Sequence, residues 1–252
     1  MATGFREALN SGRVLAFAHR GAGRLAPENT LAAFAAAVSL GYDVLETDIQ
    51  VSRDGTPYVF HDADLERLTG DGRRIGALSD ADIDSIRIGA DHAIPRLDDL
   101  LESFPEALFN LDAKTDATPA PMAAVINRHR AARRVCIGSF SDARIRETLK
   151  HLPEGTCHSI GTANTIRFLL GYVAGLPLAF TADCAQLPLS WHGAPLVNAR
   201  ALAFARRRGL RLHVWTVNDA TEMRRLLALG VDGIMTDDCA LLRRVMTEHG
   251  LW

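Results

Sequence analysis

Short apolar runs alternate with amphipathic segments along the chain. Residues 14–19 form the first apolar run, and residues 31–40 form the first helical segment, which is rich in Ala and ends at Gly41. Apolar runs of four to eight residues are typical of buried strands, whereas longer amphipathic segments are typical of helices packed on them. The pattern therefore predicts repeated βα units.

The later segments continue this alternation. Further strands are predicted at residues 44–51, 57–60, 107–113, 135–137, 156–160, 178–181, 210–217 and 233–236. Further helices are predicted at residues 96–104, 143–149, 165–172, 199–208, 221–229 and 240–248. About eight units favour an α/β fold of the TIM (β/α)8 barrel type over an open doubly wound sheet. No GxGxxG or GKT/GKS motif follows the first strand, which removes the main signal for dinucleotide and P-loop folds.

One polar stretch interrupts the alternation. Residues 63–94 are rich in Asp and punctuated by Gly. They predict an insertion after the second unit, large enough to roof one end of the barrel. No linker or internal repeat divides the chain, so residues 1–252 are predicted to form a single barrel domain.

Composition narrows the function classes. The net charge of -2 gives no reason to expect nucleic acid, which usually requires a basic excess. The four cysteines form no CxxC pair and are expected to be buried free thiols. No segment resembles a signal peptide or a transmembrane span, which predicts a cytoplasmic protein. The oligomeric state stays open.

Ionisable and aromatic residues gather where the predicted strands end. In a TIM barrel the active site lies at the carboxyl ends of the strands, so these residues are the candidates for chemistry. They are His19, Arg20, Glu46, Asp48, His61, Asp112, Lys114 and Trp215.

Three of these residues are carboxylates that we expect to converge. Glu46 and Asp48 are two residues apart on one strand and so share a face, and Asp112 ends the next long strand. Three carboxylates facing inward require a cation between them. Oxygen ligands suit one divalent cation, Mg²⁺ or Ca²⁺, better than zinc. Arg20 and Lys114 would add positive charge for a substrate phosphate.

Two histidines are the natural proton carriers. Imidazole titrates near neutral pH, so His19 and His61 suit general acid and base roles. One would deprotonate an attacking hydroxyl while the other protonates the leaving alkoxide. The alternative for each is a structural histidine at the end of a strand.

The ordered motifs resemble the glycerophosphodiester phosphodiesterase family. No single motif is specific, but the set runs in the family's order over most of the chain. The motifs are HRG at 19–21, PENT at 27–30, ETD at 46–48, HD at 61–62, PRLDDL at 95–100, NLDAK at 110–114, SF at 139–140, WTVN at 215–218 and GVDGIMTD at 230–237.

The resemblance implies a TIM barrel with a small insertion after the HD motif. It also implies His19 and His61 as acid and base, with Glu46 and Asp48 as metal ligands. Family members attack phosphorus with the glycerol 2-hydroxyl and, through a cyclic phosphate, release an alcohol and glycerol 3-phosphate. The third ligand is a Glu in most bacterial relatives, and here it is Asp112. The related spider-venom phospholipases D similarly carry Asp followed two residues on by Lys.

Several alternatives stay open. The substrate is a small glycerophosphodiester or, in a lysophospholipase D, a lysolipid, and the leaving alcohol is undetermined. A barrel kept only to bind phosphodiesters would have lost His19, His61 or a carboxylate, and all are present. Trp215 could form a substrate wall or pack in the core, and Lys114 could simply be the ion-pair partner of Asp112.

Overall fold

The computed structural model describes residues 4–89, 91–191 and 193–252. Its main sheet contains eight parallel strands, joined in the order β10-β9-β8-β2-β1-β15-β14-β11. The strands are β1 (Leu15–His19), β2 (Val44–Val51), β8 (Leu108–Ala113), β9 (Val135–Gly138), β10 (Cys157–His158), β11 (Cys184–Pro188), β14 (Arg211–Trp215) and β15 (Gly233–Thr236).

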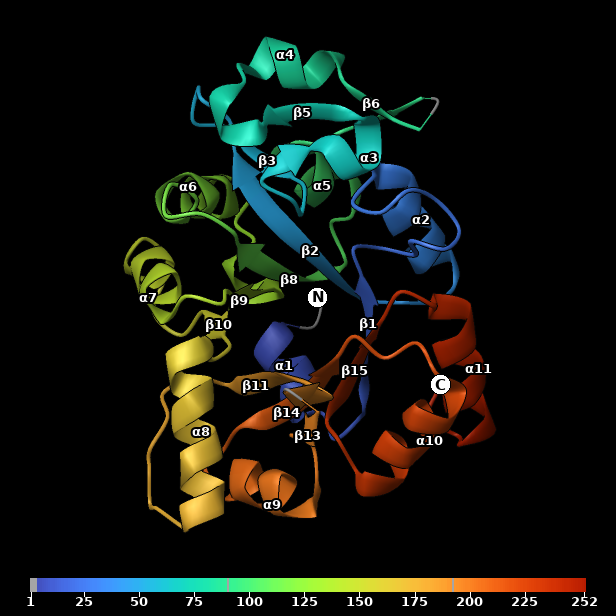
Figure 1. The fold of residues 1–252 in the computed structure, drawn as a ribbon, viewed down its shortest axis with the longest axis vertical. Helices are drawn as coiled ribbons and strands as arrows, with labels where there is room; N and C mark the ends of the chain where they lie inside the picture. The colour runs from blue at the N-terminus through green and yellow to red at the C-terminus, as the bar shows by residue number, and fades with distance from the viewer. Residues whose placement is uncertain (1–3, 90, 192) are drawn as a thin grey trace.

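The two ends of this order meet. A parallel bridge between Ser159 and Cys184 joins the end of β10 to β11. The strands thus form a nearly closed ring with helices outside it (Figure 1). The predicted TIM-type barrel is confirmed.

One helix follows each barrel strand, and intervening elements precede it after β2 and β11. The helices are α2 (Leu31–Ser39), α5 (Leu97–Ser103), α6 (Pro119–Arg128), α7 (Asp142–Lys150), α8 (Thr162–Ala174), α9 (Ala199–Arg207), α10 (Ala220–Leu229) and α11 (Cys239–Glu248). Short strands β12 (Ser190–Trp191) and β13 (Ala194–Pro195) form a hairpin after β11. No helix of the described residues is long and apolar enough to cross a membrane.

The core has two parts around the barrel wall. The larger part fills the space between strands and outer helices. A smaller cluster fills the barrel where the strands begin, and α1 (Phe5–Asn10) closes that end with Phe5 packed near Phe17. This cluster does not fill the opposite end of the barrel, where the strands end, and the cavity described below opens there.

The predicted insertion follows β3 (Pro57–Val59), which pairs antiparallel with β2. It contains β4 (Asp64–Leu65), α3 (Glu66–Thr69), β5 (Asp71–Arg74), α4 (Asp80–Ser85), β6 (Arg87–Ile88), β7 (His92–Ala93) and a 3₁₀ turn at Ile75–Ala77. It has its own small apolar cluster and stands beside the barrel (Figure 1). The expectation that it roofs the barrel is wrong, because none of its described residues lines the cavity at the strand ends.

Residues 178–181, predicted as a strand, are not one in the structure. They lie in the loop after α8, and the sixth barrel strand is β11, farther along the chain. Phe180 of this loop packs on Phe168 and Phe204, with ring centroids 6.2 and 6.4 Å away. The run is apolar because it covers two helices.

Candidate active site

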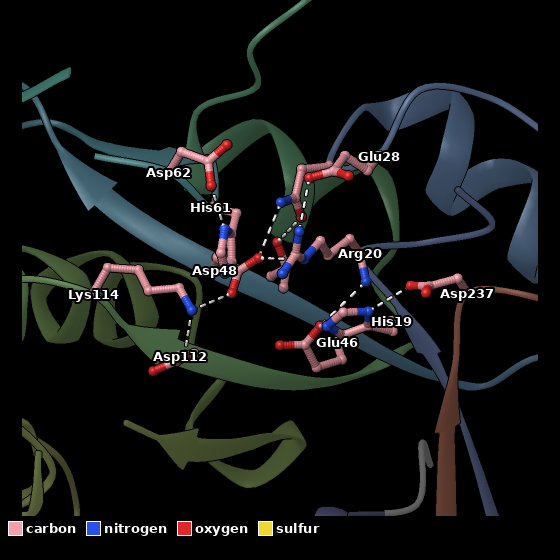
Figure 2. Close-up of polar contacts among 12 residues, drawn as sticks. His19, Arg20, Glu28, Glu46, Asp48, His61, Asp62, Asp112, Lys114 and Asp237 are labelled. Carbon is pink, nitrogen blue, oxygen red and sulfur yellow. Dashed lines mark hydrogen bonds and ion pairs between the residues drawn. The ribbon is translucent and has the colours of Figure 1, made fainter. Parts of the chain in front are cut away.

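One cavity of about 430 Å³ opens at the carboxyl ends of the strands. All eight residues that the sequence predicts for the site line this cavity: His19, Arg20, Glu46, Asp48, His61, Asp112, Lys114 and Trp215. Figure 2 shows His61 and His19 apart from each other, with Asp48 and Arg20 between them. The structure therefore brings the whole predicted set together.

Strand register places the three carboxylates. β2 and β8 pair in parallel, with Glu46 opposite Asn110 and Asp48 opposite Asp112. The side chains of Glu46 and Asp48 are only 7% and 2% exposed. Burial and then the charge of Asp48 raise the pKa of Glu46 to about 7, and burial also raises the pKa of Asp112. The site thus carries more buried negative charge than its own cations offset.

Lys114 lies between two of the carboxylates. Its Nζ is 2.7 Å from Asp48 Oδ1 and 2.7 Å from Asp112 Oδ2, while Arg20 Nε is 3.2 Å from Asp48 Oδ2. Burial opposes ionisation, but the charges of Lys114 and Arg20 hold the pKa of Asp48 below its ordinary value. Across the described residues, no three His, Cys, Asp or Glu side chains are spaced as metal ligands. Phosphate binding by Lys114 and Arg20 stays a prediction.

His19, at the end of β1, is held by a carboxylate. Its Nδ1 is 2.6 Å from Asp237 Oδ1, and Asn218 donates a hydrogen bond to the other oxygen of Asp237. Its Nε2 is 3.7 Å from Glu46 Oε2. Burial lowers the pKa of His19, but the charge of Glu46 and the hydrogen bond to Asp237 outweigh it and raise that pKa overall. Sequence reasoning gave Asp237 no role, although it directly follows β15.

Replacing Asp237 by Asn is expected to lower kcat about 10- to 100-fold with little change in KM, because the carboxylate orients His19 without contacting substrate. Steady-state kinetics on the preferred substrate would measure the change in kcat separately from the change in KM. Asp43→Asn is the matched control, since Asp43 is similarly exposed but pairs with Arg13 at the other end of the barrel. A rise in KM alone would contradict the positioning role.

His61 is held in the same way by its neighbour. Its Nδ1 is 2.6 Å from Asp62 Oδ1, so Asp62 orients the imidazole. Arg67 of the insertion donates to Asp62 at 2.7 Å and to Glu28 at 2.6 and 3.0 Å. Glu28 also accepts from Arg20 at 2.9 Å. A continuous chain of hydrogen bonds and ion pairs through Asp62, Arg67 and Glu28 therefore links His61 to Arg20.

The PENT motif does more than begin a helix. Thr30 caps α2 by accepting from the backbone N–H of Ala33. Asn29 is fully buried, donates to Asp48 Oδ2 at 3.1 Å and accepts from Thr47. Its role is to fix Asp48, which the sequence did not show.

Two residues of β14 lie at or below the cavity. Trp215 both lines the cavity and packs against the inner core, with its ring edge-on to Phe140 at 5.7 Å. His213 shares its strand but is fully buried below the site, 4.7 Å from the ring of Phe17. It does not line the cavity. The four cysteines are buried free thiols, as predicted.

Comparison with known proteins identifies the family of this chain. Residues 19–241 match the model of the glycerophosphoryl diester phosphodiesterase family. The chain belongs to this family. It is 36% identical, over 98% of its length and 96% of the relative's, to the "probable glycerophosphodiester phosphodiesterase 2" of Mycobacterium tuberculosis.

Solved structures agree with this family membership. A glycerophosphodiester phosphodiesterase from Agrobacterium tumefaciens is 27% identical, with a TM-score of 0.76 over 93% of this chain and 99% of that one. A phosphodiesterase from Oleispira antarctica, solved with its product sn-glycerol-3-phosphate, is 22% identical and supports the fold, with a TM-score of 0.80 over 95% and 99%. The predicted resemblance is confirmed, and the chain is a phosphoric diester hydrolase.

Proposed function

We propose that this glycerophosphoryl diester phosphodiesterase hydrolyses glycerophosphodiesters to glycerol 3-phosphate and an alcohol, using His19 and His61 as its acid–base pair. One observation carries the proposal: a single cavity holds two carboxylate-bound imidazoles together with three carboxylates and two cationic side chains. Each histidine uses Nδ1 for its carboxylate, which directs Nε2 to proton transfer.

The proposed reaction needs two proton transfers. The glycerol 2-hydroxyl attacks phosphorus and gives its proton to one imidazole. The bond from phosphorus to the leaving alcohol breaks while the other imidazole donates a proton to that oxygen. Water then opens the cyclic phosphate with the two imidazoles in exchanged roles, which yields glycerol 3-phosphate.

The donor chemistry of the site suits a divalent cation, although no three of the described carboxylate or imidazole side chains are spaced as metal ligands. Oδ1 of Asp112 is shielded from solvent and has no hydrogen-bond partner among the described residues. Glu46, Asp48 and Asp112 offer only oxygen ligands, which suits Mg²⁺ or Ca²⁺. When bound, the cation would supply charge stabilisation for the phosphate oxygens. Lys114 and Arg20 would bind the same phosphate from the protein side.

A substrate panel tests this proposal. Release of glycerol 3-phosphate would be followed from glycerophosphocholine and glycerophosphoethanolamine, with Mg²⁺, Ca²⁺ or EDTA. The matched analogue is 3-hydroxypropyl phosphocholine, which lacks the 2-hydroxyl. We expect metal-dependent release from the two esters and turnover of the analogue slower by on the order of 10³-fold or more, because internal attack gains a large effective molarity.

Each other result would count against one part of the proposal. Equal turnover of the analogue would contradict attack by the 2-hydroxyl. Full activity after exhaustive EDTA treatment would contradict the cation. Silence on every substrate, in a protein with intact circular dichroism, would favour a barrel that only binds phosphodiesters.

A further inference from the structure

The cavity carries charged residues on one side only. The ionisable residues that line it lie on β1, β2 and β8 or within two residues of the ends of β1, β3 and β8. The remaining described wall carries no charged side chain. Most of its large side chains are apolar, Phe140, Ile166, Leu169 and Trp215 among them, and the polar Thr162, Thr165 and Gln186 also line it. A substrate whose phosphate meets the carboxylate side would extend along this apolar wall.

Phe140 marks the boundary between the two sides. It is 60% exposed, and Lys114 Nζ lies 5.9 Å from the centre of its ring. The apolar wall therefore begins directly beside Lys114, which is predicted to bind phosphate.

Helix α8 contributes four residues to this wall and lies at the rim of the barrel (Figure 1). Thr162, Thr165, Ile166 and Leu169 line the cavity, at the spacing of one helical face. Arg167 is the only charged residue among the 13 of α8. A surface helix normally carries charge on its outer face, so this helix is unusual in offering apolar side chains both to the cavity and to solvent.

The apolar surface continues outward from the cavity. Ile166 is 42% exposed, and Leu170 and Val173 follow it along the helix at 57% and 64%. From Ile166 to Val173 the helix rises about 10 Å. Of the ten large hydrophobic residues exposed in the described chain, six belong to this region: Phe140, Ile166, Leu170, Val173, Leu176 and Trp191.

The inner side of α8 is tightly packed, so its outer face has a defined position. Phe168 is fully buried and packs edge-on against Phe204 at 5.3 Å. Gly171 allows the close approach, since a Cβ there would lie 2.5 Å from Phe204. Asp142 accepts hydrogen bonds from the backbone of Ala163 at the first turn. The exposed apolar residues therefore lie on a helix whose position is fixed by the packing of its inner face.

We propose that the α8 wall, defined as Ile166, Leu169, Leu170 and Val173, binds a single hydrocarbon chain attached to the phosphodiester substrate. The inference rests on the proposed hydrolase function and specifies its substrate class: glycerophosphodiesters that carry one acyl or alkyl chain. Continuity with the catalytic cavity favours this occupant over a separate protein partner, because a chain tethered to the phosphate meets this wall first.

Water-soluble substrates test the proposal without lipid aggregates. Three would be compared below their critical micelle concentrations: glycerophosphocholine, 1-hexanoyl-sn-glycero-3-phosphocholine with the chain on glycerol, and glycerophosphohexanol with the chain on the leaving alcohol. We expect kcat/KM to rise at least tenfold for one of the chain-bearing substrates, since each fully buried methylene contributes up to about fourfold. Which of the two gains would identify the chain's position.

Surface variants link that gain to α8. In Leu170→Gln/Val173→Gln the ratio of kcat/KM between the preferred chain-bearing substrate and glycerophosphocholine is expected to fall severalfold. Val38→Gln is the matched control, because Val38 is a 41% exposed aliphatic residue on α2 and should leave the ratio intact. No chain-dependent gain, or a gain that the α8 variant keeps in full, would overturn the inference.

A binding measurement separates this inference from the hydrolase proposal. n-Octylphosphocholine carries a chain and a phosphodiester but lacks the glycerol needed for turnover. Calorimetric affinity for it should weaken in the α8 variant and not in Val38→Gln. That result in a catalytically silent protein would contradict the proposed function alone, whereas equal affinity in both variants would contradict the chain site alone.

Discussion

Replacing either His19 or His61 by Ala is expected to lower kcat/KM for glycerophosphocholine by about 10²- to 10⁴-fold, the usual contribution of general acid–base catalysis. Both imidazoles line the cavity, and both use Nδ1 to bind a carboxylate at 2.6 Å. The double variant should be little worse than either single variant, since the two groups act in one proton exchange. Steady-state kinetics with unchanged circular dichroism would measure the effect.

His129 offers a matched control for these variants. Its Nε2 lies 2.8 Å from Asp98, so it too forms a histidine–carboxylate pair, but at the end of α6 and outside the cavity. His129→Ala should retain full turnover. Activity retained in both His19→Ala and His61→Ala would exclude the proposed acid–base pair.

The parts of the site predicted correctly depend on strand geometry. Side chains two apart on a strand share a face, so Glu46 and Asp48 could be placed together from their spacing alone. The parallel register then sets Asp48 opposite Asp112. A barrel of repeated βα units predicts that the two strands are parallel neighbours, but it does not predict which residues lie opposite each other. Neighbouring strand ends meet at one edge, and for that reason the eight predicted residues share one cavity.

The residues that were missed depend on contacts between distant parts of the chain. Asp237 lies 218 positions from the histidine that it binds, and Arg67 reaches Glu28 across 39 positions. No local pattern encodes such pairs. The one available signal for Asp237 was its place after the last strand, at the edge where the other polar residues gather.

The errors in the elements have two different causes. Residues 178–181 and the true strand Cys184–Pro188 are both short apolar runs, and only the packing of Phe180 on two helices distinguishes them. Helix α6, in contrast, was absent from the predicted elements although signals existed. Pro119 begins it, and Met122, Val125 and Ile126 recur at helical spacing on its buried face.

The largest effect on stability is expected at Glu46, where the sign depends on the cation. Among the described residues, its carboxylate accepts a hydrogen bond only from the Arg20 backbone at 3.2 Å and lies 3.7 Å from His19 Nε2. Burial and then the charge of Asp48 oppose its ionisation and raise its pKa to about 7. Glu46→Gln should therefore raise the Tm of the metal-free protein at pH 8, above the pKa of about 7. With saturating Mg²⁺ or Ca²⁺ the order should reverse.

The reversal follows from linkage between metal binding and folding. A ligand at 100 times its Kd stabilises the native state by about 2.7 kcal/mol, and 1 kcal/mol shifts Tm by about 2–4 °C in a chain of this size. The wild type should gain such a shift on adding metal, and Glu46→Gln should lose most of it. Differential scanning calorimetry with EDTA, Mg²⁺ or Ca²⁺ would compare the two.

Glu28→Gln is the matched control for Glu46→Gln, because the surroundings of Glu28 favour its charge whereas those of Glu46 oppose it. Burial disfavours the charge of Glu28, but Arg67 and Arg20 outweigh it and hold the pKa of Glu28 below its ordinary value. Its replacement should lower Tm by several degrees with or without metal, because Arg20 and Arg67 lose their negatively charged partner and one of its two acceptor oxygens. If Glu46→Gln lowers Tm in EDTA as Glu28→Gln does, Glu46 is a structural carboxylate; if it keeps the metal-induced shift, Glu46 is not a ligand.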